Sequence, residues 1–209
     1  MNSRPILLMT FVALFSMSAI GFIQLTDYSS RPGRAGQAPR QLTDLALLEA
    51  SWTGDVPGIP LGEMPTLLVF YHPKCPCTAA TVRVLERLQP RFKPTLRIIA
   101  VAYCPPDQDD AWIESRTTTA LSNLTGTQTV IDRGGKLSEQ FGALVSGHLL
   151  LYGADGRLTF SGGITPYRGH EGDSPSSLDL LRRINAPPDD CGQWAVFGCS
   201  IASDSETQR

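Results

Sequence analysis

The fold is decided by the stretch Thr66-Leu-Leu-Val-Phe-Tyr-His-Pro-Lys-Cys-Pro-Cys-Thr-Ala-Ala-Thr-Val-Arg-Val-Leu-Glu-Arg-Leu88. Its first six residues form a short apolar run of the kind that makes a buried strand. From Thr78 onward, apolar residues recur at the three-residue steps of a helix face, and Pro90 ends the pattern. Cys75 and Cys77 lie between the two runs. The pattern predicts a buried strand that leads through two thiols into a helix.

Two cysteines at the start of a helix indicate a reactive site. Unpaired backbone N–H groups and the positive end of the helix dipole stabilise a thiolate there, and we expect Lys74 to lower the thiol pKa further. A thiolate attacks disulfides and also binds soft metal ions. We therefore expect Cys75 and Cys77 to be either a redox pair, with Cys75 attacking and Cys77 resolving, or metal ligands.

The rest of the chain alternates between strand-like and helix-like runs. Such alternation predicts an α/β sandwich of three layers around a central mixed sheet, whose last two strands form a hairpin turning at Asp155-Gly156. Residues 42–50 are apolar enough for a helix or a strand, and both stay open. Strands are expected at 66–71, 95–103, 127–132, 148–152 and 158–161, and helices at 78–89, 110–124, 137–141 and 177–185.

The N-terminal segment predicts a membrane helix. Residues 5–25 carry no charge and would span about 30 Å, the thickness of the hydrocarbon core. We expect an uncleaved anchor or signal, with residues 1–4 in the cytoplasm and the rest in the periplasm or outside. Residues 26–41 are expected to be a flexible linker, 42–186 the folded domain and 187–209 a C-terminal tail. The net charge of −2 and the absence of a basic block argue against nucleic acid as a partner.

Three further cysteines follow the pair. Cys191 and Cys199 flank a short tail segment, and we expect them to form a structural disulfide. Cys104 follows the second predicted strand, where it is either a small buried side chain or a third thiol of the site. Arg168, His170 and Glu171 either line the rim of the site, bind a partner or belong to an ordinary solvated loop.

Three motifs resemble the thioredoxin-like superfamily over about residues 60–186. They are Leu67-Leu-Val-Phe-Tyr71 before the cysteines, Asp132-Arg-Gly-Gly-Lys-Leu-Ser-Glu-Gln-Phe-Gly-Ala143, and His148-Leu-Leu-Leu-Tyr-Gly-Ala-Asp-Gly-Arg157. Within that superfamily, His72-Pro-Lys-Cys-Pro-Cys77, Ser161-Gly-Gly-Ile-Thr165 and Arg168-Gly-His-Glu-Gly172 resemble a membrane-anchored group called RedB-like. The resemblance implies a thioredoxin-like fold.

The chain departs from the thioredoxin pattern at two places. One residue rather than two separates Cys75 from Cys77, and Val145-Ser146-Gly147-His148 stands where the family has a cis-proline. Copper-delivery proteins of the Sco type are a more distant resemblance, with two cysteines and a histidine near the position of His148. That resemblance implies Cys75, Cys77 and His148 as ligands for Cu(I), and also for Cu(II) or Zn(II).

Two functions are therefore expected. The first is a single-pass membrane thiol-disulfide oxidoreductase or electron-transfer protein that acts on an unidentified partner through Cys75 and Cys77. The alternative is a Sco-like copper chaperone without turnover, which passes copper from Cys75, Cys77 and His148 to an accepting protein. A weaker alternative is a docking module of an electron-transfer complex.

Overall fold

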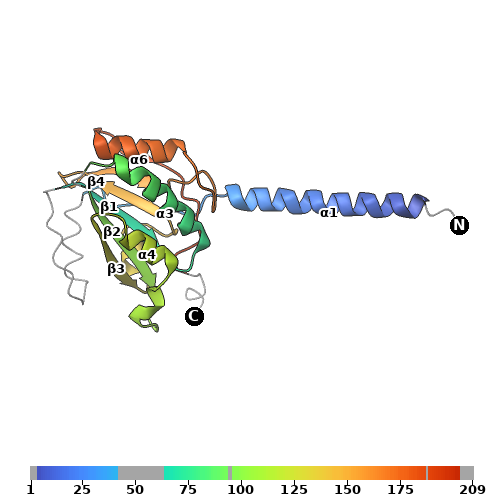
Figure 1. Ribbon diagram of the computed structural model, residues 1–209, viewed down its shortest axis with the longest axis horizontal. Coiled ribbons are helices and arrows are strands. Elements are labelled where there is room, and N and C mark those ends of the chain that lie inside the picture. Colours follow the sequence, from blue (N-terminus) through green and yellow to red (C-terminus); the bar gives the residue numbers. More distant parts are fainter. Residues whose placement is uncertain (1–3, 42–63, 94–95, 187, 203–209) are drawn as a thin grey trace. The chain divides into compact units, whose positions relative to one another are not determined.

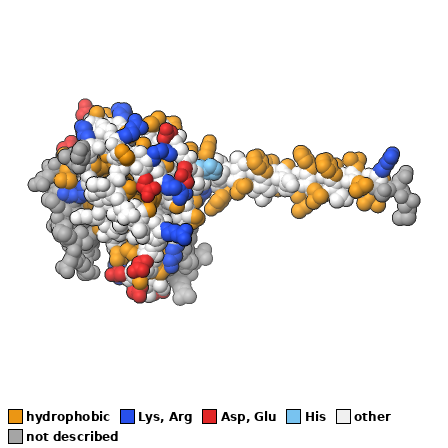
Figure 2. Space-filling model, in the orientation of Figure 1, with side chains coloured by type: hydrophobic (Ala, Val, Ile, Leu, Met, Phe, Trp, Pro, Cys, Tyr) orange, Lys and Arg blue, Asp and Glu red, His pale blue; other side chains and the backbone are white. Residues whose placement is uncertain are grey.

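The computed structural model describes residues 4–41, 64–93, 96–186 and 188–202. The chain divides into two compact units, Met1–Arg31 and Pro32–Arg209. The first contains the helix α1, Arg4–Ser30, whose 27 residues extend past the predicted end at Leu25. Figure 2 shows apolar side chains along this helix, none of them buried. Within the described residues, α1 is the one helix long and apolar enough to cross a membrane.

The second unit is built on a mixed sheet of six strands in the order β3-β2-β1-β4-β5-β6. β1, β2 and β3 are parallel, β4 is antiparallel to β1 and β5, and β6 is parallel to β5. The predicted hairpin is therefore confirmed, whereas β6 has no counterpart in the prediction. The strands are β1 Thr66–Tyr71, β2 Arg97–Cys104, β3 Thr127–Arg133, β4 His148–Tyr152, β5 Leu158–Gly162 and β6 Gly192–Gln193.

The helices α3, α4 and α6 cover one face of the sheet (Figure 1), and α5 packs on the other face, which confirms the three-layer sandwich. Alternate residues of β1 point to opposite faces: Val69 packs in the core beneath α3, α4 and α6, and Phe70 packs in the core beneath α5. The helices are α3 Pro76–Leu88, α4 Arg116–Ser122, α5 Lys136–Gln140 and α6 Pro175–Asn185, with the 3-10 turns η2 Gln89–Arg91 and η3 Asp110–Ile113.

The helix α3 follows from the apolar spacing seen in the sequence. Val82, Leu85 and Leu88 are buried against the sheet. The helix begins at Pro76, two residues before the predicted start, because proline fits the first helical position, where no N–H is needed. Cys77 is therefore inside the first turn of α3 rather than in the preceding loop.

The helix predicted at 110–124 is interrupted. The 3-10 turn η3 ends at Ile113, and α4 begins after Ser115. The cause is local, because the Ser115 side chain accepts a hydrogen bond from the Thr118 N–H at 3.0 Å and so caps a new helix.

Residues 33–41 lie along the folded domain, although the sequence suggested a flexible linker. The N–H of Gly36 donates to the carbonyl of Gly142, and the Tyr152 hydroxyl donates to the Pro39 carbonyl. Gln41 forms a bridge with Arg157. These bonds satisfy backbone groups that a free tether would leave to water. The run at 42–50, for which the sequence allows a helix or a strand, lies outside the described residues.

Candidate functional site

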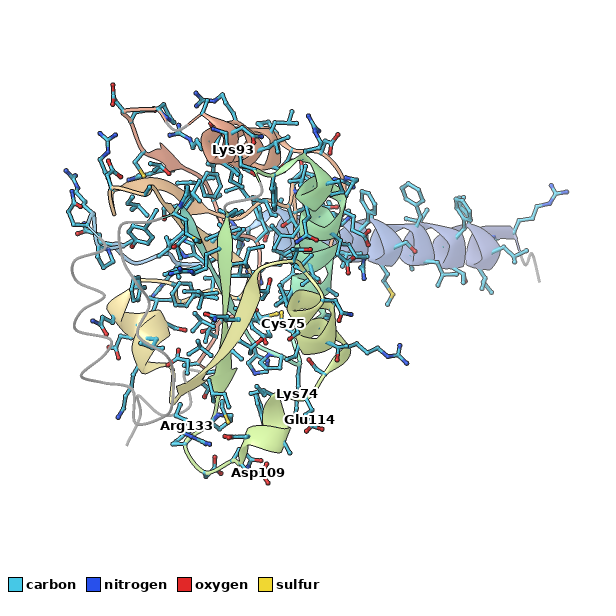
Figure 3. All side chains as sticks on the ribbon, turned by 60° about the vertical axis from the view of Figure 1, so that its left-hand side comes forward. Lys74, Cys75, Lys93, Asp109, Glu114 and Arg133 are labelled. Atoms are coloured by element: carbon cyan, nitrogen blue, oxygen red, sulfur yellow. The ribbon has the colours of Figure 1, made fainter. Side chains whose placement is uncertain are left out.

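The first thiol lies where β1 ends and α3 begins, as Figure 3 shows for Cys75. Cys75 is the N-cap residue of α3, with extended backbone angles (φ −84°, ψ 118°). Its N–H bonds the His72 carbonyl at 3.0 Å, and its own carbonyl accepts the Thr78 N–H at 3.2 Å. The cysteine is buried, with 4% of its surface exposed. The predicted placement of Cys75 at the mouth of a helix is what the structure shows.

Three thiols gather at this helix mouth. The sulfur atoms of Cys75, Cys77 and Cys199 all lie within 4.8 Å of one another. Cys75 is buried, and the other two are partly exposed. The sequence did not predict Cys199 at this site, because it lies more than a hundred residues from the pair.

The C-terminal tail brings Cys199 to the site by pairing with residues 144–146. The Cys199 carbonyl accepts the Ser146 N–H at 2.8 Å, and the N–H of Ile201 donates to the Leu144 carbonyl at 3.0 Å. Ser200 forms an antiparallel bridge with Val145. The approach is close, because a Cβ added at Gly198 would collide with the Ser146 carbonyl. The tail is therefore held in register beside the thiols.

Ser146 forms hydrogen bonds to the cysteine loop, to α3 and to the tail. Its hydroxyl accepts the N–H of His72 at 2.8 Å and is hydrogen-bonded to the hydroxyl of Thr78. The next residue, Gly147, has φ 91°, a conformation that favours glycine, and its N–H donates to the Phe70 carbonyl. The stretch that lacks the family's cis-proline thus joins the cysteine loop, α3 and the tail. No cis peptide occurs among the described residues.

The three thiols differ in acidity. Burial alone would raise the pKa of Cys75, but hydrogen bonds from the backbone and side chain of Cys199 and of Thr78 outweigh it and lower that pKa. Burial and the Cys75 charge raise the pKa of Cys77. Burial, a hydrogen bond to Cys75 and the charges of both other thiols raise the pKa of Cys199 to about 12. The arrangement favours one thiolate, on Cys75, beside two protonated thiols.

Lys74, which the sequence suggested would lower the thiol pKa, contacts an aromatic ring. Its ammonium lies 4.4 Å from the centroid of the Trp112 ring, in a cation–π contact. His72 packs on the same ring, with centroids 5.2 Å apart, and accepts the Lys74 N–H at its Nδ1. His72 therefore shapes the loop, while the donors to Cys75 come from Cys199 and Thr78.

His148 is not with the thiols. It pairs with Phe70 across β1 and β4, so it shares the face of the sheet opposite α3. Its Nε2 is hydrogen-bonded to the Ser161 hydroxyl at 3.0 Å, and burial lowers its pKa to about 4. Among the described residues, the metal-ligating cluster at the site contains Cys199 and not His148. The structure does not bring together the set Cys75, Cys77 and His148.

The remaining cysteines lie elsewhere. Cys104 is fully buried, with its sulfur 3.5 Å from the Asp109 carbonyl, which agrees with a small buried side chain. Cys191 packs against the core beneath α5. Cys191 and Cys199 are free thiols, so the disulfide expected between them is not formed in the structure. The tail runs along β5 between them and places Cys199 at the site instead.

The loop that follows β5 contacts both α3 and the tail. Glu171 pairs with Arg83, and Asp173 pairs with Arg87 at 2.9 Å. The Arg168 guanidinium donates to the Gly198 carbonyl, and its charge favours the thiolate of Cys77. His170 is bonded to the Arg168 carbonyl at 2.8 Å. Arg168 therefore lies at the rim of the site, whereas His170 and Glu171 are exposed to solvent.

Solved structures of several proteins resemble this chain. A hypothetical protein of Sinorhizobium meliloti 1021 matches with a TM-score of 0.53 and 16% identity, over 85% of this chain and 93% of the other. A secreted Mycobacterium tuberculosis disulfide oxidoreductase homologous to E. coli DsbE matches with a TM-score of 0.43 and 19% identity, over 63% and 87%. A SCO1/SenC family lipoprotein from Bacillus anthracis str. Ames matches with a TM-score of 0.40 and 11% identity, over 60% and 82%.

The fold is thioredoxin-like, as the sequence predicted. The order of the central strands and the placement of helices on both faces are those of that fold. No family model and no curated protein matches the chain in sequence. At these identities the likeness concerns the fold alone, and the narrower RedB-like resemblance stays a prediction.

Proposed function

We propose that this protein is a membrane-anchored thiol-disulfide oxidoreductase in which Cys75 is the attacking thiol. The observation that carries the proposal is the cluster of three thiols at the start of α3, with sulfur atoms within 4.8 Å of one another, and the acidity at the site agrees with it. Of the five cysteines, all of which the structure describes, Cys75 alone has a lowered pKa. A thiolate is the nucleophile in disulfide exchange, and the adjacent thiols of Cys77 and Cys199 can complete a disulfide with it.

Both thiols beside Cys75 are partly exposed, so a partner can approach the site from solvent. The partner is a protein that supplies or accepts a disulfide. The helix α1 anchors the chain as a single-pass protein, with the thiol domain in the periplasm or outside. Labelling of intact cells with a membrane-impermeant maleimide tests this orientation. Labelling only after lysis would contradict it.

Reduction of glutathione disulfide by the reduced full-length chain in detergent micelles tests the chemistry. Cys75→Ser should abolish the reaction, because no other thiol is stabilised as a thiolate. Cys104→Ser is the matched control, since Cys104 lies outside the thiol cluster, and this variant should react like the wild type. Activity that survives in Cys75→Ser would refute the proposed role.

A soft metal ion such as Cu(I) is the second candidate. Three sulfur ligands within 4.8 Å of one another suit a soft cation, so the donor set fits copper without an imidazole. Bound copper would be the cargo that this protein transfers to an accepting protein. Cys75, Cys77 and Cys199 would hold it.

Competition of the reduced full-length chain with a Cu(I) chelator tests this second candidate. Cys199→Ser should weaken copper binding, whereas His148→Ala should leave it unchanged, because His148 is bonded to Ser161 away from the cluster. If His148→Ala weakened binding and Cys199→Ser did not, the three-cysteine ligand set would be wrong. The absence of stoichiometric binding would remove the copper role altogether.

A further inference from the structure

The tail that carries Cys199 is fixed at several points within its described residues, 188–202. At its start, the Arg183 guanidinium donates to the carbonyl of Asp190 at 2.7 Å. In the middle, Val196 is buried and its carbonyl accepts the Gly33 N–H at 2.8 Å. Near the last described residue, Ile201 packs in the core beneath α5. Such a path presents the Cys199 thiol to Cys75 in a defined position.

Cys77 is less well placed to form a disulfide with Cys75. Cys75 is the N-cap of α3 and Cys77 is the second helical residue. Only Pro76 separates the two cysteines, so a disulfide between them would close a small strained ring. A bond between them would disturb the first turn, including the 3.2 Å hydrogen bond from Thr78 N–H to the Cys75 carbonyl. Disulfides also have strict geometric requirements, which a partner on a separate segment meets more easily.

We propose that Cys199 is the resolving thiol of the site, so that the oxidised protein carries a disulfide between Cys75 and Cys199. This proposal rests on the proposed thiol-disulfide exchange at Cys75. It replaces the assignment of the resolving step to Cys77, and it gives the C-terminal tail a catalytic role in place of a structural disulfide with Cys191.

The reaction takes two steps with a disulfide substrate. First, the Cys75 thiolate attacks one sulfur of the substrate disulfide; a mixed disulfide forms, the substrate S–S bond breaks, and the second substrate sulfur leaves as a thiolate. Next, the Cys199 sulfur attacks the Cys75 sulfur, and the remaining substrate sulfur leaves. The Cys199 proton passes to a departing thiolate. The substrate disulfide is reduced by two electrons, and the Cys75–Cys199 dithiol is oxidised by two.

Disulfide mapping of the full-length chain in micelles tests the proposal, with glutathione disulfide as the probe. After acid quenching and alkylation of free thiols, trypsin together with chymotrypsin separates Cys191 from Cys199, since Trp194 and Phe197 lie between them. Cys75 and Cys77 stay on one peptide, and its fragmentation in the mass spectrometer shows which of the two sulfurs is bridged. Wild-type protein should give a Cys75–Cys199 peptide and lose two thiols. Cys104→Ser, which changes a thiol outside the cluster, should behave in the same way.

The Cys199→Ser variant should retain glutathione on Cys75 and clear it at least about tenfold more slowly than the wild type. A Cys75–Cys77 or Cys191–Cys199 linkage in the wild type would overturn the proposal and leave exchange at Cys75 standing. The absence of any product at Cys75, in the wild type and all variants, would instead refute the proposed function. If Cys199→Ser fails to fold, the wild-type map still decides.

Discussion

Ser146 donates its backbone N–H to the carbonyl of Cys199 at 2.8 Å, and this bond joins the end of the tail to the centre of the site. The same residue bonds His72 in the cysteine loop and Thr78 in the first turn of α3. The thioredoxin family has a proline in this stretch, and proline has no N–H to donate. The serine therefore permits a contact with the chain's own tail that a proline would prevent.

Ser146→Pro should loosen the tail. The substitution removes one backbone hydrogen bond, worth about 1 kcal/mol, so local opening of the tail should increase about fivefold. The rate at which chymotrypsin cleaves the native chain after Trp194 and Phe197 measures this opening. Ser146→Ala is the matched control because it keeps the N–H. Equal cleavage rates in the two variants would show that the bond does not hold the tail.

Cys199→Ala should raise the pKa of Cys75. The substitution removes the thiol that donates to the Cys75 thiolate and keeps only the backbone contact. The thiolate fraction at neutral pH should therefore fall, and the pH profile for reaction with glutathione disulfide should move to higher pH. Cys104→Ala serves as the control. An unchanged profile, or one moved to lower pH, would contradict the described role of Cys199.

His148 should make the protein sensitive to acid. Burial lowers its folded pKa from 6.5 to about 4, so the unfolded state binds the proton more readily between these values. The contribution of neutral His148 to the free energy of unfolding is fully present above pH 6.5. The free energy of unfolding should fall by about 3 kcal/mol as the pH drops toward 4. Urea unfolding of wild type and His148→Gln across this range measures the effect. The variant should lack this part of the pH dependence; an identical slope would exclude His148 as its source.

Arg183 should contribute more to stability than its neighbour Arg182. Both bond Asp179, but the side chain of Arg183 is 4% exposed and that of Arg182 is 56% exposed. Arg183 also donates hydrogen bonds to the carbonyls of Thr159 and Asp190. Arg183→Ala should reduce the free energy of unfolding by about 3 kcal/mol, and Arg182→Ala by less than about 1 kcal/mol. Similar losses in thermal or urea unfolding would contradict this account.

Local features of the site were predictable because they depend on adjacent residues. The apolar run of β1 and the spacing of Val82, Leu85 and Leu88 define a strand and a helix within one short stretch. The position of Cys75 between them follows directly. The thioredoxin-like fold was also predictable, since alternating strands and helices restrict the topology.

The third thiol was not predictable, because its position depends on long-range backbone pairing. β6 has two residues, and the bridge between Val145 and Ser200 joins isolated positions. Neither has a periodic signal in the sequence. Gly198 before Cys199 was the available clue, since a side chain there would collide with Ser146.

The sequence-based prediction that His148 lies with the thiols failed for a different reason. Its position at the start of the hairpin follows from the sequence, but the face on which its side chain lies depends on strand register. Pairing with Phe70 puts it opposite α3, whereas a shift of one residue would have put it on the face of Val69. A single sequence does not determine that register.

The most direct test of the central claim is the order in which the five cysteines ionise in the reduced full-length chain. Cysteine-labelled protein in micelles can be titrated by carbon-13 NMR at the Cβ positions, with assignments from single Cys→Ser variants. The account predicts that Cys75 titrates at the lowest pH and Cys199 near pH 12. If Cys77 or Cys199 titrated first, Cys75 would not be the attacking thiolate and the mechanism would be contradicted.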